Sequence, residues 1–272
     1  MASVQPVAPG VIAADTITKL PPEAKGAVVI SGSHGGRYPG YVAAKGGVRA
    51  VILNDAGLGK DAAGIGSLPY LEALGIAACT VSHESCRIGD TQDMIARGRV
   101  SHSNATARAA GVIAGMACLE AAVLLTGAPH SVVDPPELGE ARFEITDSGA
   151  RRIVVVDSAS LVRPEDAGHI VVTGSHGGLV GGDPAMALRT EAFAGVFNDA
   201  GIGIDDAGIG RLPALDVRGV AAFTVSAASA RIGEGRSTFD DGVISRVNAT
   251  AARVGALEGL RARDVLLRWA GC

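Results

Sequence analysis

Hydrophobic residues along the chain occur in short, nearly continuous runs separated by glycine-rich loops. The runs include AVVIS (27–31), VRAVIL (48–53), IAACTV (76–81) and, in the second half, HIVVT (169–173). Uninterrupted apolar runs of this length predict strands that are buried on both faces of a sheet. Helical patterns such as YVAAKGG (41–47) and AGIGSLPYLEALG (63–75) lie between the runs. This alternation predicts a mainly parallel sheet covered by helices.

The pattern is duplicated within the 272-residue chain. Residues 15–36 align with 157–178, and residues 54–111 align with 198–255. The most similar stretches, NDAGLGKDAAGIG and NDAGIGIDDAGIG, are identical at 10 of 13 positions. A repeat of this length is a domain-sized α/β unit rather than the short unit of a solenoid.

We therefore expect an N-terminal extension (1–14), a first α/β unit (15–125), a connecting segment (126–156) and a second unit (157–272). Within the connecting segment, Asp147-Ser148-Gly149 predicts the turn of a β-hairpin. At the level of the fold, each unit resembles Rossmann-like or flavodoxin-like sheets. In the flavodoxin-like strand order, the first repeated strand would lie between the second and the third.

Three repeated loops follow the predicted strands. GSHGG (32–36 and 174–178) follows the first strand, NDAG (54–57 and 198–201) the second, and SHESCRIGD (82–90) or SAASARIGE (226–234) the third. Open α/β sheets bind ligands at the carboxyl ends of their strands. Amides in glycine-rich loops can also hold an anion. The loops therefore predict a site for a small polar ligand.

The first-repeat loops suggest a catalytic triad. In the expected strand order, His34 would lie between Asp55 and Ser82, which is the order carboxylate, base, nucleophile. Cys86 is the rival nucleophile, with His83 as its base. The alternative is that His34 and Asp55 only hold their loops in place through hydrogen bonds.

The remaining expected binding residues come from the same loops in both repeats. They are Gly35, Gly36, Asn54, Lys60, Ser85, Arg87, His176, Asn198, Asp199, Ser226 and Arg231. Arg87 and Arg231 can clamp a substrate carboxylate. Their alternative role is an ion pair with Asp90 or Glu234, or across the interface between the repeats.

Reactive side chains are concentrated in the first repeat. Lys60, His83, Glu84, Cys86 and His102 align with Ile204, Ala227, Ala228, Ala230 and Arg246. One interpretation is a single chemical site in the first repeat. The other interpretation is based on the His, Asp, Ser and Arg residues that both repeats keep. It predicts two sites, or one composite site near a pseudo-twofold axis.

Composition narrows the function. The net charge of −4 and the 3% aromatic content give no basis for nucleic-acid binding. No signal peptide or membrane-spanning run is evident, so we expect a cytoplasmic protein with reduced cysteines. We also expect a homo-oligomer. Asn104 and Asn248 match glycosylation sequons but are expected to cap helices instead.

The first functional hypothesis is hydrolysis of a small polar amide, cyclic imide or ester that carries a carboxylate or another anionic group. A lyase or isomerase that uses His and Asp, with or without a metal, is the alternative, and a non-catalytic ligand-binding protein is the third possibility. No cofactor is expected, because metal-binding spacings such as HxH and HExxH do not occur. A divalent ion held by His34 and Asp55 remains open.

Overall fold

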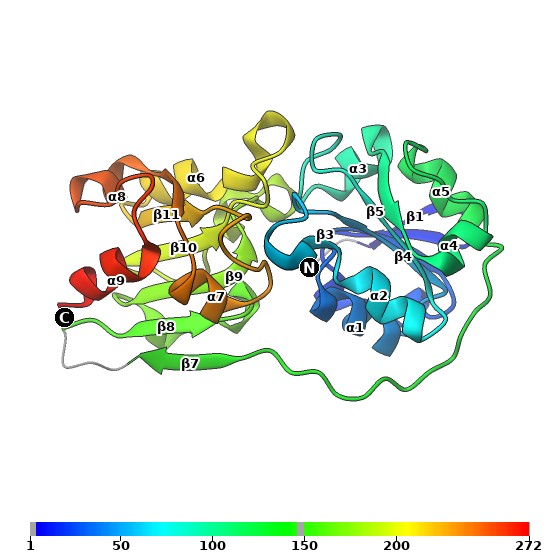
Figure 1. Cartoon of the computed structure of the whole chain (residues 1–272), viewed down its shortest axis with the longest axis horizontal. Coiled ribbons are helices and arrows are strands. Elements are labelled where there is room, and N and C mark those ends of the chain that lie inside the picture. Colours follow the sequence, from blue (N-terminus) through cyan, green and yellow to red (C-terminus); the bar gives the residue numbers. More distant parts are fainter. Residues whose placement is uncertain (1–3, 146–149, 272) are drawn as a thin grey trace.

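A computed structural model describes residues 4–145 and 150–271 of the chain. Two α/β units lie side by side along the long axis of the molecule, joined by a segment that runs along one side from α5 to β7 (Figure 1). Each unit contains a six-stranded sheet with four central parallel strands and an antiparallel strand at each edge. The predicted duplicated α/β fold with mainly parallel sheets is confirmed.

The strands follow one another in chain order within each sheet. The first sheet contains β1 (Val4–Ala8), β2 (Val11–Ala14), β3 (Val28–His34), β4 (Ala50–Asn54), β5 (Ala77–Val81) and β6 (Val100–Ser103). The second contains β7 (Arg142–Ile145), β8 (Ile153–Val156), β9 (Ile170–His176), β10 (Ala194–Asn198), β11 (Ala221–Val225) and β12 (Ile244–Val247).

This strand order corrects the expected flavodoxin-like order. Residues 4–14, predicted as an extension, form β1 and β2, and β2 pairs with β3. Only one edge of β3 then remains for β4, so β4 lies at the centre between β3 and β5. Similarly, β7 and β8 of the predicted connecting segment pair as an antiparallel hairpin in the second sheet. The predicted turn at Asp147-Ser148-Gly149 lies outside the described residues.

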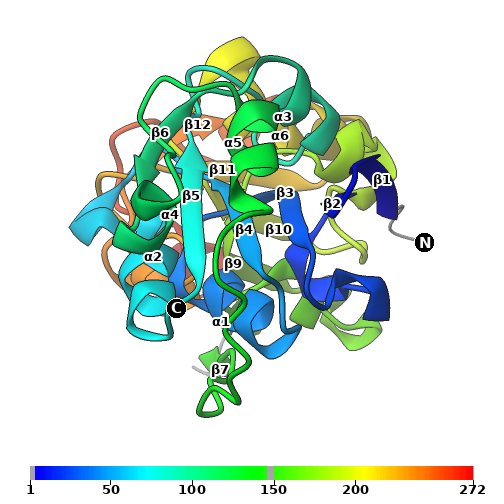
Figure 2. The ribbon, with the colours of Figure 1, turned by 90° about the vertical axis from the view of Figure 1, so that its right-hand side faces the viewer.

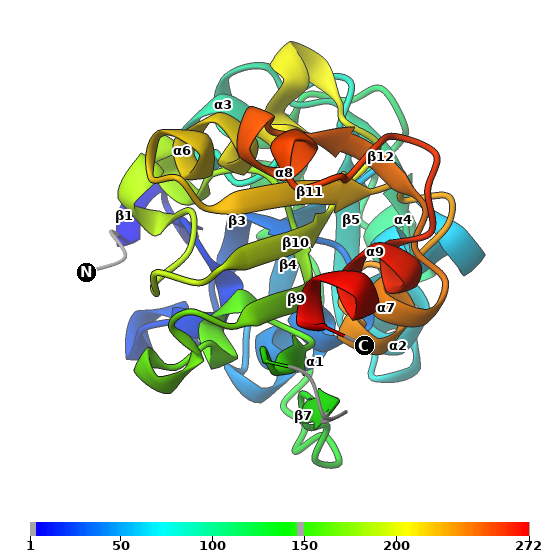
Figure 3. The same cartoon turned by 90° about the vertical axis from the view of Figure 1, so that its left-hand side faces the viewer.

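Helices cover both faces of each sheet, as Figure 2 and Figure 3 show from the two ends of the molecule. The first unit contains α1 (Arg37–Lys45), α2 (Ser67–Ala73), α3 (Thr91–Arg97), α4 (Ala105–Ala109) and α5 (Cys118–Leu125). The second contains α6 (Arg211–Val217), α7 (Gly235–Asp240), α8 (Ala249–Arg253) and α9 (Ala262–Ala270). In the first sheet, Val28 and Ile30 face the core under α3 to α5, whereas Val29 faces α1 and α2. Both faces of the strand are therefore buried, which explains why its residues form a near-continuous apolar run.

The predicted asparagine caps are confirmed. The side-chain oxygen of Asn104 accepts a hydrogen bond from the Ala107 amide at 2.9 Å, and that of Asn248 accepts one from the Ala251 amide at 2.8 Å. Both asparagines are buried and also bond the neighbouring central strand.

None of the helices in the described residues is long and apolar enough to cross a bilayer.

The units differ at one element. The first unit has α1 after its GSHGG loop, whereas the second has two short 3-10 turns, η6 (Val180–Gly182) and η7 (Pro184–Met186). In place of the helix, Ala187 and Leu188 pack on that face of the second sheet. This difference shapes the cavity between the units.

The two units meet through their NDAG loops. Gly57 and Gly201 both have positive φ, and a Cβ added to Gly57 would lie 2.7 Å from the Cα of Gly201. The Lys60 amide donates to the Ala227 carbonyl at 2.7 Å, and the Ile204 amide donates to the His83 carbonyl at 2.9 Å. The sheets therefore face each other with the carboxyl ends of their parallel strands.

Replacement of Gly57 by Ala should destabilise the protein more than replacement of Gly219 by Ala. Both glycines have positive φ, but nothing lies within 4 Å of a Cβ at Gly219. Gly219→Ala should cost about 1 kcal/mol of backbone strain, and Gly57→Ala should cost roughly 1–3 kcal/mol more through the clash with Gly201. Urea unfolding measures both, and equal losses would contradict the close contact of the loops.

Candidate functional site

The repeated loops serve first as an interface between the units. Ala56 and Ile88 of the first unit form an apolar cluster with Ala200 and Ile232 of the second. Arg87 Nε contacts Asp205 at 3.0 Å, and Arg231 contacts Asp61 at 2.7 Å in the equivalent position. Lys60 similarly reaches Asp241 of the second unit at 2.9 Å. The arginines thus adopt the alternative expected for them, ion pairs across the repeats, rather than the carboxylate clamp.

Asp55 and His83 form a hydrogen-bonded pair at this interface. Asp55 Oδ1 lies 2.8 Å from His83 Nδ1 and accepts a hydrogen bond from the His83 amide at 2.9 Å. The hydrogen bond to Asp55 raises the pKa of His83 above its ordinary value. Burial alone would raise the pKa of Asp55, but the hydrogen bonds from His83 hold it below the usual value.

The predicted triad geometry is not formed. Because β4 lies at the centre, Asp55 follows the middle strand, and His34 and Ser82 follow the strands on either side, about two strand spacings apart. The carboxylate of Asp55 bonds His83 and the Gly57 amide, not His34.

The rival nucleophile is also unsuitable. Cys86 is fully buried, its thiol contacts the Ser82 carbonyl at 3.5 Å, and burial raises its pKa to about 12. A thiol with so high a pKa is almost entirely protonated at neutral pH, so it is a poor nucleophile. Ser82 Oγ accepts a hydrogen bond from the Glu84 amide and so fixes the turn that follows β5.

The other predicted binding residues hold loops. Asn54 and Asn198 are buried and accept bonds from the amides of Ala56 and Ala200. The Gly35 amide donates to the Asn54 carbonyl, and the Ser85 hydroxyl donates to the Ser82 carbonyl. The Asp199 carboxylate accepts from the amides of Gly201 and Ala227, and Ser226 Oγ accepts from the Ala228 amide. Gly36 donates to His34. Of all predicted site residues, only His34 and His176 line the cavity described next.

A cavity of about 630 Å³ lies between the two units, beside their interface. It is lined by His34, Ser33, Tyr38 and residues 15–19 of the first unit, by Glu140, and by Ser158–Ser160, Ser175, His176, Arg189 and Arg211 of the second. Its volume lies in the range of small-molecule sites. The histidines of both GSHGG loops therefore line one cavity.

Much of the cavity wall is pseudo-symmetric. Ser33 Oγ accepts a hydrogen bond from the Ile17 amide at 3.1 Å, and Ser175 Oγ accepts one from the Ala159 amide at 2.9 Å. The serine of GSHGG thereby holds a 3-10 turn, η1 (Ile17–Lys19) or η4 (Ala159–Leu161). Each turn presents a hydroxyl pair, Thr16 with Thr18 at 2.9 Å and Ser158 with Ser160 at 2.8 Å.

His34 is held as a neutral hydrogen-bond donor, whereas His176 is a neutral ring whose buried Nδ1 has no hydrogen-bond partner among the described residues. The Gly36 amide donates to His34 Nδ1 at 3.2 Å, which places the proton of the neutral ring on Nε2. Burial lowers the pKa of His34 to about 4. Burial also lowers the pKa of His176 well below its ordinary value, and the charge of Arg211 lowers it further. The rings are therefore uncharged at neutral pH.

Each histidine packs against a glycine of the other unit. A Cβ on Gly233 would lie 3.3 Å from Cε1 of His34, and a Cβ on Gly89 would lie 3.3 Å from Cε1 of His176. Both glycines have positive φ. The repeated RIG sequence thus leaves room for the histidine of the opposite repeat.

Three cavity residues break the symmetry and were missed by the sequence analysis. Tyr38 lies on α1, which the second unit lacks; Glu140 belongs to the segment between the units; and Arg211 replaces Ser67 of the first repeat. Burial raises the pKa of Glu140, and the charge of Asp157 adds to this shift, whereas hydrogen bonding to Tyr38 opposes it. Comparison of the two repeats could have singled out Arg211, but nothing in the sequence singled out Glu140.

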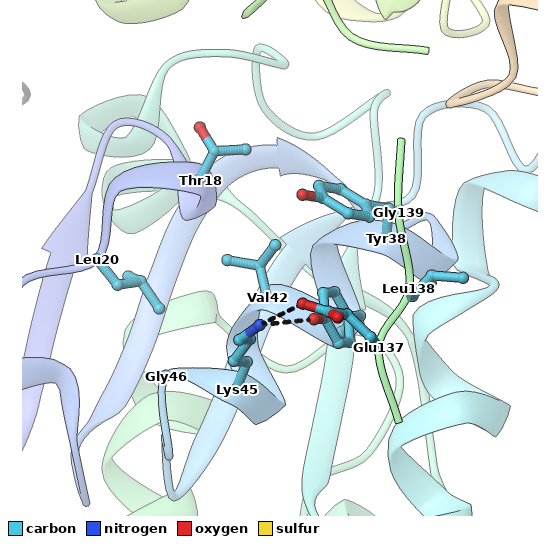
Figure 4. Close-up of a pocket in the computed structure, with 10 residues that line it drawn as sticks. Thr18, Leu20, Tyr38, Val42, Lys45, Gly46, Glu137, Leu138 and Gly139 are labelled. Atoms are coloured by element: carbon cyan, nitrogen blue, oxygen red, sulfur yellow. Dashed lines mark hydrogen bonds and ion pairs between the residues drawn. The ribbon is translucent and has the colours of Figure 1, made fainter. Parts of the chain in front are cut away.

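A second, more open hollow lies beside α1, under residues 137–139 (Figure 4). Lys45 points toward Glu137 at 3.4 Å and toward the Tyr41 hydroxyl at 3.0 Å. Its charged groups satisfy one another, and both ionic side chains are largely exposed. The cavity between the units is therefore the better candidate site.

No known protein family, curated protein or solved structure matches this chain. In the described part of the chain, no three His, Cys, Asp or Glu side chains are grouped so as to hold a metal ion.

An NMR pH titration should separate the histidine environments. We expect His34 to titrate at about 4, below its ordinary value of 6.5, and His83 to titrate above 6.5. Replacement of Asp55 by Asn should lower the pKa of His83 and leave that of His34 unchanged. A His34 pKa near 6.5 would contradict the buried, neutral donor.

Proposed function

We propose that this protein is an enzyme that performs acid–base chemistry on a small polar substrate in the cavity between its units. The observation that carries the proposal is the presence of three titratable side chains in one cavity whose pKa values are all shifted by burial. The carboxyl of Glu140 has a raised pKa, while the two histidines have lowered pKa values. Side chains in a cavity whose pKa values are strongly perturbed are typical of functional sites.

The cavity residues can divide the work of proton transfer. Glu140 would remove a proton from carbon next to a substrate carbonyl, and the raised pKa makes its carboxylate a stronger base. The Nε2–H group of His34 would donate a hydrogen bond to the oxygen on which negative charge develops, and the neutral ring of His176 would line the same cavity. Neutral imidazole donors fixed before the reaction stabilise such charge without reorganisation. The reaction class is an isomerisation or elimination.

Hydrolysis of a small amide, cyclic imide or ester is the second candidate. The same donor could stabilise an oxyanion, and Glu140 could activate water in place of a protein nucleophile. This version replaces the serine or cysteine mechanism, because Ser82 and Cys86 do not line the cavity. Cytoplasmic location and self-association stay predictions from the sequence.

Replacement of Glu140 by Gln should lower turnover by at least about 100-fold. Small carbonyl acids, amides and imides would be incubated with the protein in D₂O, and NMR would follow deuterium incorporation and product formation. Glu137→Gln is the matched control, since Glu137 is exposed in the same segment and lies outside this cavity. Binding without turnover, or full activity in Glu140→Gln, would overturn the proposal and favour a ligand-binding protein.

The pH dependence of kcat/KM gives a second test. A base acts in its deprotonated form, so the rate should rise as pH increases through the pKa of Glu140, which lies above 4.5. Because His34 stays neutral above about 4, it should not produce a second step near pH 6.5. A rate that falls as pH rises from 4.5 to 7 would contradict the role of Glu140 as a base.

A further inference from the structure

Arg211 is a buried cation in the cavity wall without a carboxylate partner. Its residue is only 4% exposed, and it forms no ion pair with any described residue. Nε donates to the Gly178 carbonyl at 3.0 Å, and Nη1 donates to the carbonyls of Met186 and Ala187. The guanidinium also stacks over the ring of Phe197 at 4.9 Å. These contacts fix the group, but none of them is an ion pair, and burying a cation without one is costly.

A second arginine adds positive charge to the same cavity. Arg189 lines the same cavity, is exposed, and forms no ion pair with a described residue. Its positive charge and, to a larger extent, burial lower the pKa of Arg211 to about 10. Two arginines that line one cavity, neither of them in an ion pair with a described residue, favour an anionic ligand.

The second unit is built to hold Arg211 in this place. The position is Ser67 in the first repeat, where α1 covers the end of the sheet. In the second repeat, η6 and η7 replace that helix, and the carbonyls at the end of η7 accept the hydrogen bonds of Arg211. The loss of one helix and the gain of one arginine therefore occur at the same wall.

We propose that Arg211 and Arg189 form an anion subsite that holds the carboxylate of a small organic acid. Nε and Nη1 of Arg211 are bonded to carbonyls, so Nη2 is the group left to bind a carboxylate oxygen, and the planar fork of Arg189 matches the same carboxylate. Asp15, Asp183 and Glu140 also line the cavity, so a single negative charge suits it better than a phosphate dianion does. Only the statement that this acid is the substrate rests on the proposed function; anion binding does not require turnover.

The test measures binding of acetate, pyruvate, succinate and glutarate by NMR and calorimetry. Acetamide and succinamide serve as neutral matches, and inorganic phosphate serves as the competing anion. The unmodified protein should bind at least one acid more tightly than its amide and more tightly than phosphate. Arg211→Met should weaken binding of that acid by at least about tenfold, and Arg189→Met should weaken it severalfold.

Arg218→Met is the matched control. Arg218 also lies at an end of α6 and donates to carbonyls of the same loop, those of Leu188 and Thr190, but it pairs with Glu191 at 2.8 Å and does not line the cavity. Its replacement should leave carboxylate binding unchanged. If Arg211→Met does not fold, the exposed Arg189→Met and the charge-preserving Arg211→Lys decide the question.

The results separate the two proposals. Carboxylate binding that persists in Glu140→Gln and is lost in Arg211→Met or Arg189→Met supports the subsite, even if turnover is never observed. The subsite is overturned if no acid binds the unmodified protein, if phosphate binds more tightly than every acid, or if Arg189→Met binds as the unmodified protein does.

Discussion

The close contact of Gly57 with Gly201 constrains how the two units are arranged. Side chains at these positions would collide with the opposite backbone, so the NDAG loops meet only because both carry glycine with positive φ. Their contact brings the carboxyl ends of both sheets together. The usual ligand-binding edge of an α/β sheet is thereby partly buried, and the edge near β3 and β9 remains as a shared cavity.

Duplication and divergence have different consequences in this chain. Residues that both repeats keep, such as Arg87 with its equivalent Arg231, mostly hold the interface. Even His83, found only in the first repeat, bonds Asp55 there. The histidines of GSHGG are the exception, because both face the cavity. Groups that break the symmetry, Glu140 and Arg211, supply the perturbed acid and the unpaired charge. The proposed chemistry therefore depends on the differences between the repeats.

The sequence predicted the α/β class, the duplication and the Asn104 and Asn248 caps, because hydrophobic periodicity and internal similarity are local signals. It did not predict the strand order, which depends on β2 pairing with β3 and so on a long-range contact. The triad failed for that reason. His34 was correctly placed at a strand end, but the residues that share its cavity also come from the opposite repeat and from the connecting segment. Contacts of Glu140 and Tyr38 have no spacing signature in a single sequence.

The central claim is that both units build one site per chain. The most direct measurement is the stoichiometry of ligand binding, combined with ¹⁵N shifts of the imidazole rings as the best-binding small molecule is added. We expect one ligand per chain, with the Nε2 signals of His34 and His176 shifting together along a single binding curve. Two ligands per chain, or a shift of only one histidine, would contradict the composite cavity.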